Sequence, residues 1–163
     1  MSIFLALYLA ALPIPHKLVS PKTCDVVKIN DGDTIRVSCQ GKIDRIRFCG
    51  IDSPETARRG KSAQPYSAEA KNLVKRLLQG GKVEVTELGR DRYGRMIGEL
   101  FVGTTFINAE VVKAGFAYEY KAYSKTCPHK IEIAKAEAIA QRKKVGIWDG
   151  GNYQFPWDFR KSK

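Results

Sequence analysis

Alternating apolar and polar positions dominate the chain between residues 25 and 51. The segment "DVVKINDGDTIRVSC" (25–39) predicts two strands rich in Val, Ile and Thr, with a turn at Asp31-Gly32 between them. The segment "KIDRIRFCGI" (42–51) alternates in the same way and predicts a third strand. Two further strands are predicted at 82–88 and 95–102, on either side of a turn at Tyr93-Gly94.

Helical periodicity appears in three other segments. The clearest is "SAEAKNLVKRLLQGG" (67–81), in which apolar residues recur at helical spacing, Ser67 can cap the start and Gly80-Gly81 ends the helix. A shorter helix is predicted at 106–115 and a longer one around 128–144. The order of these elements predicts a mainly β, α+β protein, built as a five-stranded barrel of the oligonucleotide-binding (OB-fold) type with about three helices.

The first twenty residues differ in kind from the rest. An uninterrupted apolar run from Ile3 to Leu12 is too short to span a bilayer as a helix, but it suits a secretory signal followed by Pro13 and Pro15. Because no Lys or Arg precedes the run, a buried N-terminal helix or strand stays open as the alternative. We expect a signal peptide or N-terminal anchor at 1–20, one folded domain at 21–150 and a C-terminal tail at 151–163.

The charge balance narrows the class of partner. The chain has 163 residues, enough for one domain with a substantial core, and its 28 Lys and Arg exceed its 17 Asp and Glu, for a net charge of +11. Such a field attracts polyanions, of which nucleic acid is the commonest. A solvated basic surface without a partner would have the same composition, so charge alone does not identify a chemistry.

The cysteines bear on whether the protein resides in an oxidising compartment. There are four: Cys24, Cys39, Cys49 and Cys127. Their spacing contains no CxxC pair of the kind found in zinc or redox sites. Cys24 and Cys39 lie symmetrically about Asp31-Gly32, so a cross-strand disulfide is one interpretation, and it would fit an oxidising compartment. Simple hairpin counting, however, puts them at the wider hydrogen-bonded kind of pair, unless a bulge changes the register. Cys49 and Cys127 are equally compatible with buried free thiols.

Acidic residues follow two of the predicted strands and turns. Asp33 comes just after the Asp31-Gly32 turn, and "DSPE" places Asp52 and Glu55 where the third strand ends. Turn formation would explain Asp31 and Asp52 by itself, and it explains Glu55 less well. A hard divalent cation needs several oxygen ligands brought together, which Asp33 and Asp52 supply if their strand ends converge.

Two arginines also lie in the predicted strands and turns. Arg47 alternates with apolar Ile46 and Phe48, and Arg95 leads out of the turn in "DRYGR" (91–95). Each guanidinium offers forked donors that match phosphate oxygens. Paired acids, a cation site and two arginines together favour metal-assisted cleavage of a phosphodiester.

The ordered series of motifs resembles the staphylococcal nuclease (thermonuclease) family. The series consists of "DGDT", "IRFCGIDSPE", "DRYGR", a short helix ending in Gly and a helix closing in "GIW", and it extends from about Cys24 to Trp148. The ending "PWDFR" (156–160) also resembles tails of bacterial members. The resemblance implies an OB-fold nuclease domain at 21–150 that carries a calcium-dependent phosphodiesterase site.

Carried over position by position, the resemblance assigns roles to six residues. It implies Ca²⁺ ligands at Asp33, Asp52 and the backbone carbonyl of Ser53, where the family usually has threonine. It implies that Glu55 holds the attacking water and acts as the general base, a role disputed within the family. Arg47 and Arg95 would clamp the phosphate, with Arg47 pointing outward toward it.

The resemblance also indicates candidate substrate contacts. Arg92 replaces a family lysine, and Arg92 and Tyr93 are candidate substrate contacts in the "DRYGR" turn. The segment "YEYKAYSKTC" gives two registers for the stacking tyrosines, so Tyr118, Tyr120 and Tyr123 are all candidates, with Tyr120 and Tyr123 preferred. Packing of some of them against the barrel is the alternative.

Two functions follow from this resemblance. The first is a secreted or periplasmic, calcium-dependent endonuclease, expected to be a monomer without a stable membrane span. It would act on DNA and RNA, single-stranded or denatured by preference, with little sequence specificity. The second is a non-catalytic OB-fold module that binds single-stranded nucleic acid. Three carboxylates near a polyanion favour the enzyme, since they repel phosphate unless a cation lies between them.

Overall fold

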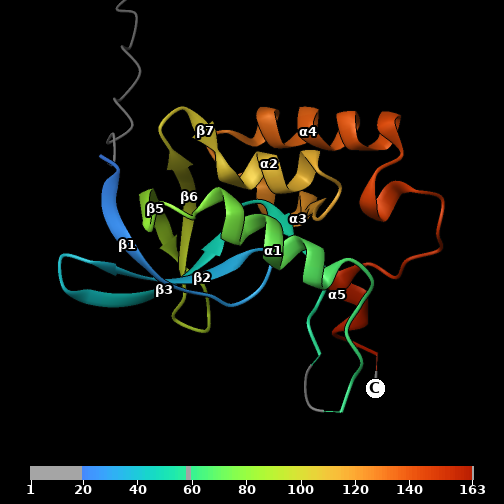
Figure 1. The fold of residues 1–163 in the computed structure, drawn as a ribbon, viewed down its shortest axis with the longest axis horizontal. Coiled ribbons are helices and arrows are strands. Elements are labelled where there is room, and N and C mark those ends of the chain that lie inside the picture. Colours follow the sequence, from blue (N-terminus) through green and yellow to red (C-terminus); the bar gives the residue numbers. More distant parts are fainter. Residues whose placement is uncertain (1–19, 58–59, 163) are drawn as a thin grey trace, which may run out of the picture.

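A computed structural model describes residues 20–57 and 60–162 of the chain (Figure 1). Almost all of the predicted leader lies outside these residues. Five strands form the barrel: β1 (Lys22–Ile29), β2 (Thr34–Cys39), β3 (Lys42–Phe48), β5 (Lys82–Arg90) and β6 (Met96–Val102). Their order is β3-β2-β1-β5-β6, and a parallel pairing of β3 with β6 closes the barrel. The predicted five-stranded OB-fold-type barrel of the α+β class is therefore confirmed.

The barrel interior is filled from alternate positions of these strands. Ile35, Ile46, Val85 and Leu100 are buried in one continuous cluster. Where β3 meets β6, Ile46 pairs with Met96, and both side chains are buried. Because side chains alternate along a strand, Arg47 beside Ile46 and Arg95 beside Met96 come to lie on the outer face of the barrel.

Three longer helices cover the barrel: α1 (Ser67–Leu77), α2 (Ile107–Lys113) and α4 (Lys130–Lys143). Figure 1 shows α2 and α4 side by side above the barrel, with α1 crossing beside them. All three match predicted helices, but the predicted cap of the first does not form. The N-cap residue is Tyr66, in a left-handed conformation without a side-chain cap bond, and Ser67 is already helical and buried.

The first turn differs from the predicted two-residue hairpin. Strand β1 ends at Ile29 and β2 begins at Thr34, so residues 30–33 form the connection, closed by a bond from the Asn30 N–H to the Thr34 carbonyl. Within β1, the pairing register with β2 shifts between Val26 and Lys28. This bulge changes the hairpin count, and it brings Cys24 and Cys39 to a Cα separation of 4.4 Å, where they form a disulfide.

A second disulfide joins Cys49 to Cys127, so neither is a free thiol. It ties the end of β3 to the segment between α3 (Lys121–Ser124) and α4. A two-residue ladder reinforces the tie, because β4 (Ile51–Asp52) pairs with β8 (Tyr118–Glu119). The buried side chain of Asn108 also donates to the Cys49 carbonyl at 3.0 Å and accepts from the Leu100 N–H at 3.1 Å. The turn after β3 is thus held from three sides.

Two glycines allow a close backbone crossing behind this region. The Ile147 N–H donates to the Gly115 carbonyl at 2.9 Å. A Cβ atom on Gly115 would lie 2.2 Å from the Val145 oxygen, and one on Gly146 would lie 2.0 Å from the Gly115 oxygen. The end of α2 and the 3₁₀ helix η1 (Gly146–Trp148) therefore meet through backbone alone.

Several short elements were not predicted. These are β4, β7 (Thr105–Phe106), β8, α3, η1 and α5 (Pro156–Phe159). The last of them folds back beside the loop that follows β4, at the lower right of Figure 1. Within the described residues, no helix has both the length and the apolar character needed to cross a membrane.

Candidate active site

Asp33 and Asp52 come together where β2 begins and β4 ends. The Ser53 backbone N–H donates to Oδ2 of Asp33 at 2.6 Å, and the Thr34 hydroxyl donates to its Oδ1 at 3.0 Å. The Phe48 N–H bonds to the Asp33 carbonyl at 2.8 Å, which joins the two strand ends directly. Both carboxylates are buried, Asp52 completely. Two acids that are 19 positions apart in the sequence therefore share one site.

The Arg47 guanidinium lies between these two acids. It forms ion pairs with Oδ1 of Asp33 and Oδ1 of Asp52, and it donates to the Ile51 carbonyl at 3.1 Å. Its side chain leaves the barrel core, but only 13% of it is exposed. Arg47 thus points toward the acids, and its positive charge compensates much of their burial.

Glu55 is positioned through its backbone by Gln64. Its N–H donates to Oε1 of Gln64 at 3.0 Å, and its carbonyl accepts from the Gln64 N–H at 2.9 Å. These reciprocal bonds fix the loop after β4, so that the Glu55 carboxylate extends on the side of Asp52. Gln64 was not singled out in the sequence, since a glutamine in a polar loop carries no local signal.

A third arginine, Arg160, joins the acids from the end of the chain. Its Nη1 and Nη2 bond to Oδ1 and Oδ2 of Asp52 at 3.0 and 2.9 Å, and Nη1 also contacts Oε1 of Glu55 at 2.6 Å. Burial of the guanidinium works to lower its pKa, but the bonds to the two acids outweigh burial and hold that pKa above its usual range. Sequence reasoning missed this residue, because a basic C-terminal run ordinarily indicates a solvated tail.

The oxygen donors at this site suit a hard cation. Asp33 and Asp52 provide carboxylates, and the adjacent Ser53 provides a backbone carbonyl, the donor types that Ca²⁺ prefers, with water completing the coordination. No group of three His, Cys, Asp or Glu side chains close enough to hold a metal occurs in the described part of the chain. Two guanidinium groups already contact these carboxylates, so the site attracts and holds positive charge.

Arg95 belongs to a separate cluster at the start of β6. Its Nε donates to Asp91 at 2.6 Å, and its guanidinium lies 5.6 Å from the Tyr93 ring centre. Burial works to raise the pKa of Asp91, but hydrogen bonds from Arg95 and from the Tyr93 N–H outweigh it and lower that pKa. Because Arg47 pairs with Ile97 across the parallel ladder, Arg95 is two positions away on the same outer face.

The other residues of this turn extend into solvent. Tyr93 is 69% exposed, and the Arg92 guanidinium lies 4.9 Å from its ring centre. Both are accessible to a ligand that passes over the outer face of the barrel.

The three candidate tyrosines have different surroundings. Tyr118 is buried against Trp148, Phe155 and Trp157, and burial raises its pKa to about 12. Tyr123 is 64% exposed, and Tyr120 lies between it and the tail, with its ring stacked on Trp157 at 4.9 Å. Tyr118 is therefore a packing residue, and Tyr120 and Tyr123 lie nearer the surface.

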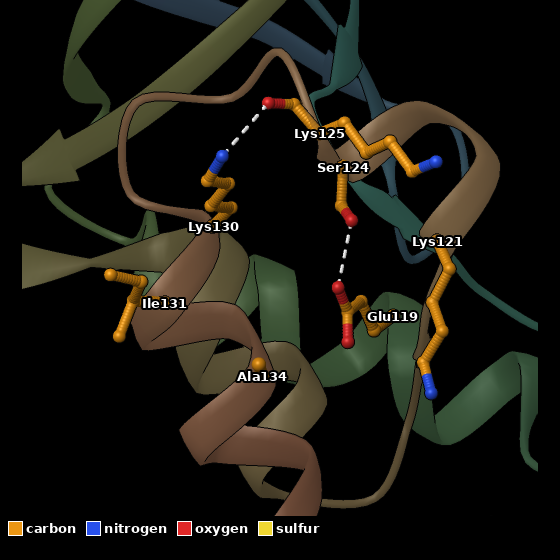
Figure 2. Close-up of a pocket in the computed structure, with 7 residues that line it drawn as sticks. All are labelled: Glu119, Lys121, Ser124, Lys125, Lys130, Ile131 and Ala134. Carbon is orange, nitrogen blue, oxygen red and sulfur yellow. Dashed lines mark hydrogen bonds between the residues drawn. The ribbon is translucent and has the colours of Figure 1, made fainter.

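A hollow of about 370 Å³ is a separate feature of the structure. Figure 2 shows its lining, in which Ser124 donates to Glu119 at 2.7 Å and Lys130 donates to the Lys125 carbonyl at 3.3 Å. Its other lining residues are Lys121, Ile131 and Ala134. None of the acids and arginines of the candidate site lines this hollow.

Known proteins share this sequence pattern. Residues 45–150 match the family described as Staphylococcal nuclease homologue. The chain is 36% identical over 129 residues to the thermonuclease of Staphylococcus hyicus, covering 78% of this chain and 76% of that protein. It is 33% identical over 147 residues to the micrococcal nuclease of Shigella flexneri, covering 85% of this chain and 80% of that protein.

A plant relative is longer. The staphylococcal-like nuclease CAN1 of Arabidopsis thaliana is 38% identical over 119 residues, which is 73% of this chain but 34% of the plant protein. The chain therefore spans about a third of the length of such relatives. The region that matches the family model contains β5 and β6 together with Arg47, Asp52, Glu55 and Arg95. On this match and on the two bacterial relatives, the chain belongs to the staphylococcal nuclease family.

Proposed function

We propose that this protein is a calcium-dependent endonuclease that hydrolyses phosphodiester bonds of DNA and RNA with little sequence preference. The observation that carries the proposal is the meeting of Asp33, Arg47 and Asp52 from three different strand ends at one outer surface of the barrel. The names of the bacterial relatives, thermonuclease and micrococcal nuclease, support the same reaction class.

In this mechanism Asp33, Asp52 and the Ser53 carbonyl would hold Ca²⁺. The bound ion would polarise the phosphate and offset its negative charge. Arg47 would turn part of its hydrogen bonding from the acids to the phosphate oxygens, where its forked donors match the developing charge. Arg95 would approach the same phosphate from the neighbouring strand after leaving Asp91.

Glu55 would act on the nucleophile. Its carboxylate extends beside Asp52 while Gln64 holds its backbone, so its free oxygen can accept a proton from a water molecule. Attack by that water would displace the 5′ oxygen of the next nucleotide. The products would then carry a 3′ phosphate and a 5′ hydroxyl.

Exposed side chains would hold the rest of the polynucleotide. Tyr93 and Tyr123 present rings on which bases can stack, and Arg92 adds positive charge beside Tyr93. Stacking of this kind tolerates any base, which fits low specificity. Formation of both disulfides suits a secreted or periplasmic protein, since these compartments are oxidising.

The test is digestion of heat-denatured DNA and of RNA, with Ca²⁺ and with excess chelator, followed by analysis of the product ends. We expect cleavage with Ca²⁺ only, loss of at least about 100-fold in turnover for Glu55→Gln, and weaker Ca²⁺ dependence for Asp33→Ala. Glu69→Gln, at an exposed position of α1, is the matched control and should retain activity. Tight binding of an oligonucleotide without any cleavage would instead indicate the non-catalytic binding module.

A further inference from the structure

The C-terminal segment is folded onto the candidate active site. Arg160 is 108 positions from Asp52 in the sequence, yet its guanidinium contacts both oxygens of that carboxylate. The same guanidinium reaches Oε1 of Glu55. One side chain of the tail thus contacts both Asp52, a proposed ligand of the cation, and Glu55, the proposed general base.

Contacts along the whole segment hold the tail in this place. The Gln154 carbonyl accepts from Nε2 of Gln64 at 2.7 Å, and the Phe159 carbonyl accepts from Lys61 at 3.2 Å. Between these two points Trp157 stacks on Tyr120, with the ring planes 10° apart. Docking therefore combines backbone bonds, an aromatic stack and an ion pair.

Arg160 and a divalent cation compete for the same oxygens. Asp52 is completely buried, and three guanidinium nitrogens already bond to it, two of them from Arg160. A cation that binds at a carboxylate lies about 2.3–2.6 Å from its oxygens, in the space where these donors lie. Two positive groups that share one carboxylate repel each other, so each weakens the binding of the other.

We propose that the segment 154–162 is an intramolecular inhibitor, which must leave Asp52 before the site binds Ca²⁺. This inference rests on the proposed calcium site and adds its regulation. Docking also covers one face of Tyr120 with Trp157, so the docked tail withholds a candidate stacking surface as well. Because Ca²⁺ binds only the form in which the tail is undocked, its apparent association constant is that of the undocked form multiplied by the undocked fraction. Ca²⁺ binding in turn shifts the tail toward the undocked state.

The first test compares Ca²⁺ affinity, measured by titration calorimetry without substrate, in the full chain and three variants. Arg160→Ala should bind Ca²⁺ about tenfold more tightly. Trp157→Ala changes no charge but loosens docking, so it should also bind more tightly. Lys161→Ala removes the same charge from the neighbouring exposed position and should match the unchanged chain.

Each other outcome overturns the inference. Equal Ca²⁺ affinity in all four proteins would refute it and leave the proposed calcium site intact. Tighter binding in Arg160→Ala but not in Trp157→Ala would show that Arg160 acts through its charge and not through docking. Failure of all four to bind Ca²⁺ would refute the proposed calcium dependence, and this inference with it.

A second readout follows the tail itself. In a Trp148→Phe background Trp157 is the remaining tryptophan, and its fluorescence reports on the stack with Tyr120. Ca²⁺ should shift this emission toward that of an exposed tryptophan over the same concentration range as binding. Emission that stays constant while Ca²⁺ binds would show that the tail remains docked, which would refute the competition.

Discussion

Replacement of each disulfide in turn by a pair of alanines tests how the two crosslinks stabilise the barrel. One variant carries Cys24→Ala and Cys39→Ala, and the other carries Cys49→Ala and Cys127→Ala. Each variant loses two sulfur atoms from buried or half-buried positions, so the packing losses are similar. The main difference between them is the length of chain that each crosslink closes.

The sequence separations set the magnitudes. A crosslink across 15 positions restricts the unfolded chain by about 3 kcal/mol, and one across 78 positions by about 4.5 kcal/mol. We therefore expect both variants to lose stability, and the variant without the Cys49–Cys127 bond to lose about 1.5 kcal/mol more. The two loops do not overlap in the sequence, so the losses should add in the variant without either bond.

Urea unfolding at 25 °C, followed by circular dichroism, measures these free energies. The unchanged protein with both disulfides intact is the reference, and thiol titration verifies the state of the remaining pair. A larger loss in the variant without the Cys24–Cys39 bond would refute the loop-length reasoning. That result would show that the β1–β2 bulge depends on its crosslink for native packing.

Three further predictions concern single side chains. Arg95→Lys should lower turnover about 100-fold, nearly as much as Arg95→Ala, because a point charge cannot replace the planar fork; steady-state kinetics with near-normal activity for the lysine variant would contradict the clamp. Asn108→Ala removes the side chain that bonds to the buried Cys49 carbonyl and Leu100 N–H, so it should lower the free energy of unfolding, measured by urea titration, by about 2–6 kcal/mol. The control Asn152→Ala, at an exposed position, should change it by less than about 0.5 kcal/mol. Burial raises the pKa of Glu137, and the hydrogen bond from the Glu119 N–H offsets this rise only in part. As pH rises above 4.5, the unfolded chain therefore loses this proton before the folded protein does, and the free energy of unfolding falls. The fall should be smaller in Glu137→Gln, and identical pH profiles of unfolding for the two proteins would refute the prediction.

Local patterns predicted the regular elements well. Alternation along β1, β2, β3, β5 and β6 and helical spacing in α1, α2 and α4 are properties of short windows, and all eight elements form close to where they were predicted. The positions of Asp33 and Asp52 at neighbouring strand ends also followed from the order of strands and turns. Their convergence at Arg47 depends on barrel closure, which a short window does not contain.

Features that depend on distant contacts were missed. The bulge in β1 appears only as a mismatch between two strands. The β4–β8 ladder pairs Ile51 with Glu119 and Asp52 with Tyr118, which lie 68 and 66 positions apart in the sequence. The position of Arg160 depends on aromatic packing of the tail and on bonds to Lys61 and Gln64. No local rule distinguishes such a residue from the solvated basic residues beside it.

The contact between Gly115 and Gly146 has a consequence for inheritance. The glycine that ends α2 and the glycine of "GIW" look like two independent signatures, yet both are required at one backbone crossing. A methyl group on Gly115 would meet the Val145 carbonyl, and one on Gly146 would meet the Gly115 carbonyl. A change at one cannot be rescued by enlarging the other, so descendants should keep both or lose both. A chimera with a relative that is joined between residues 116 and 145 will retain this crossing only if glycine stands on each side of the junction.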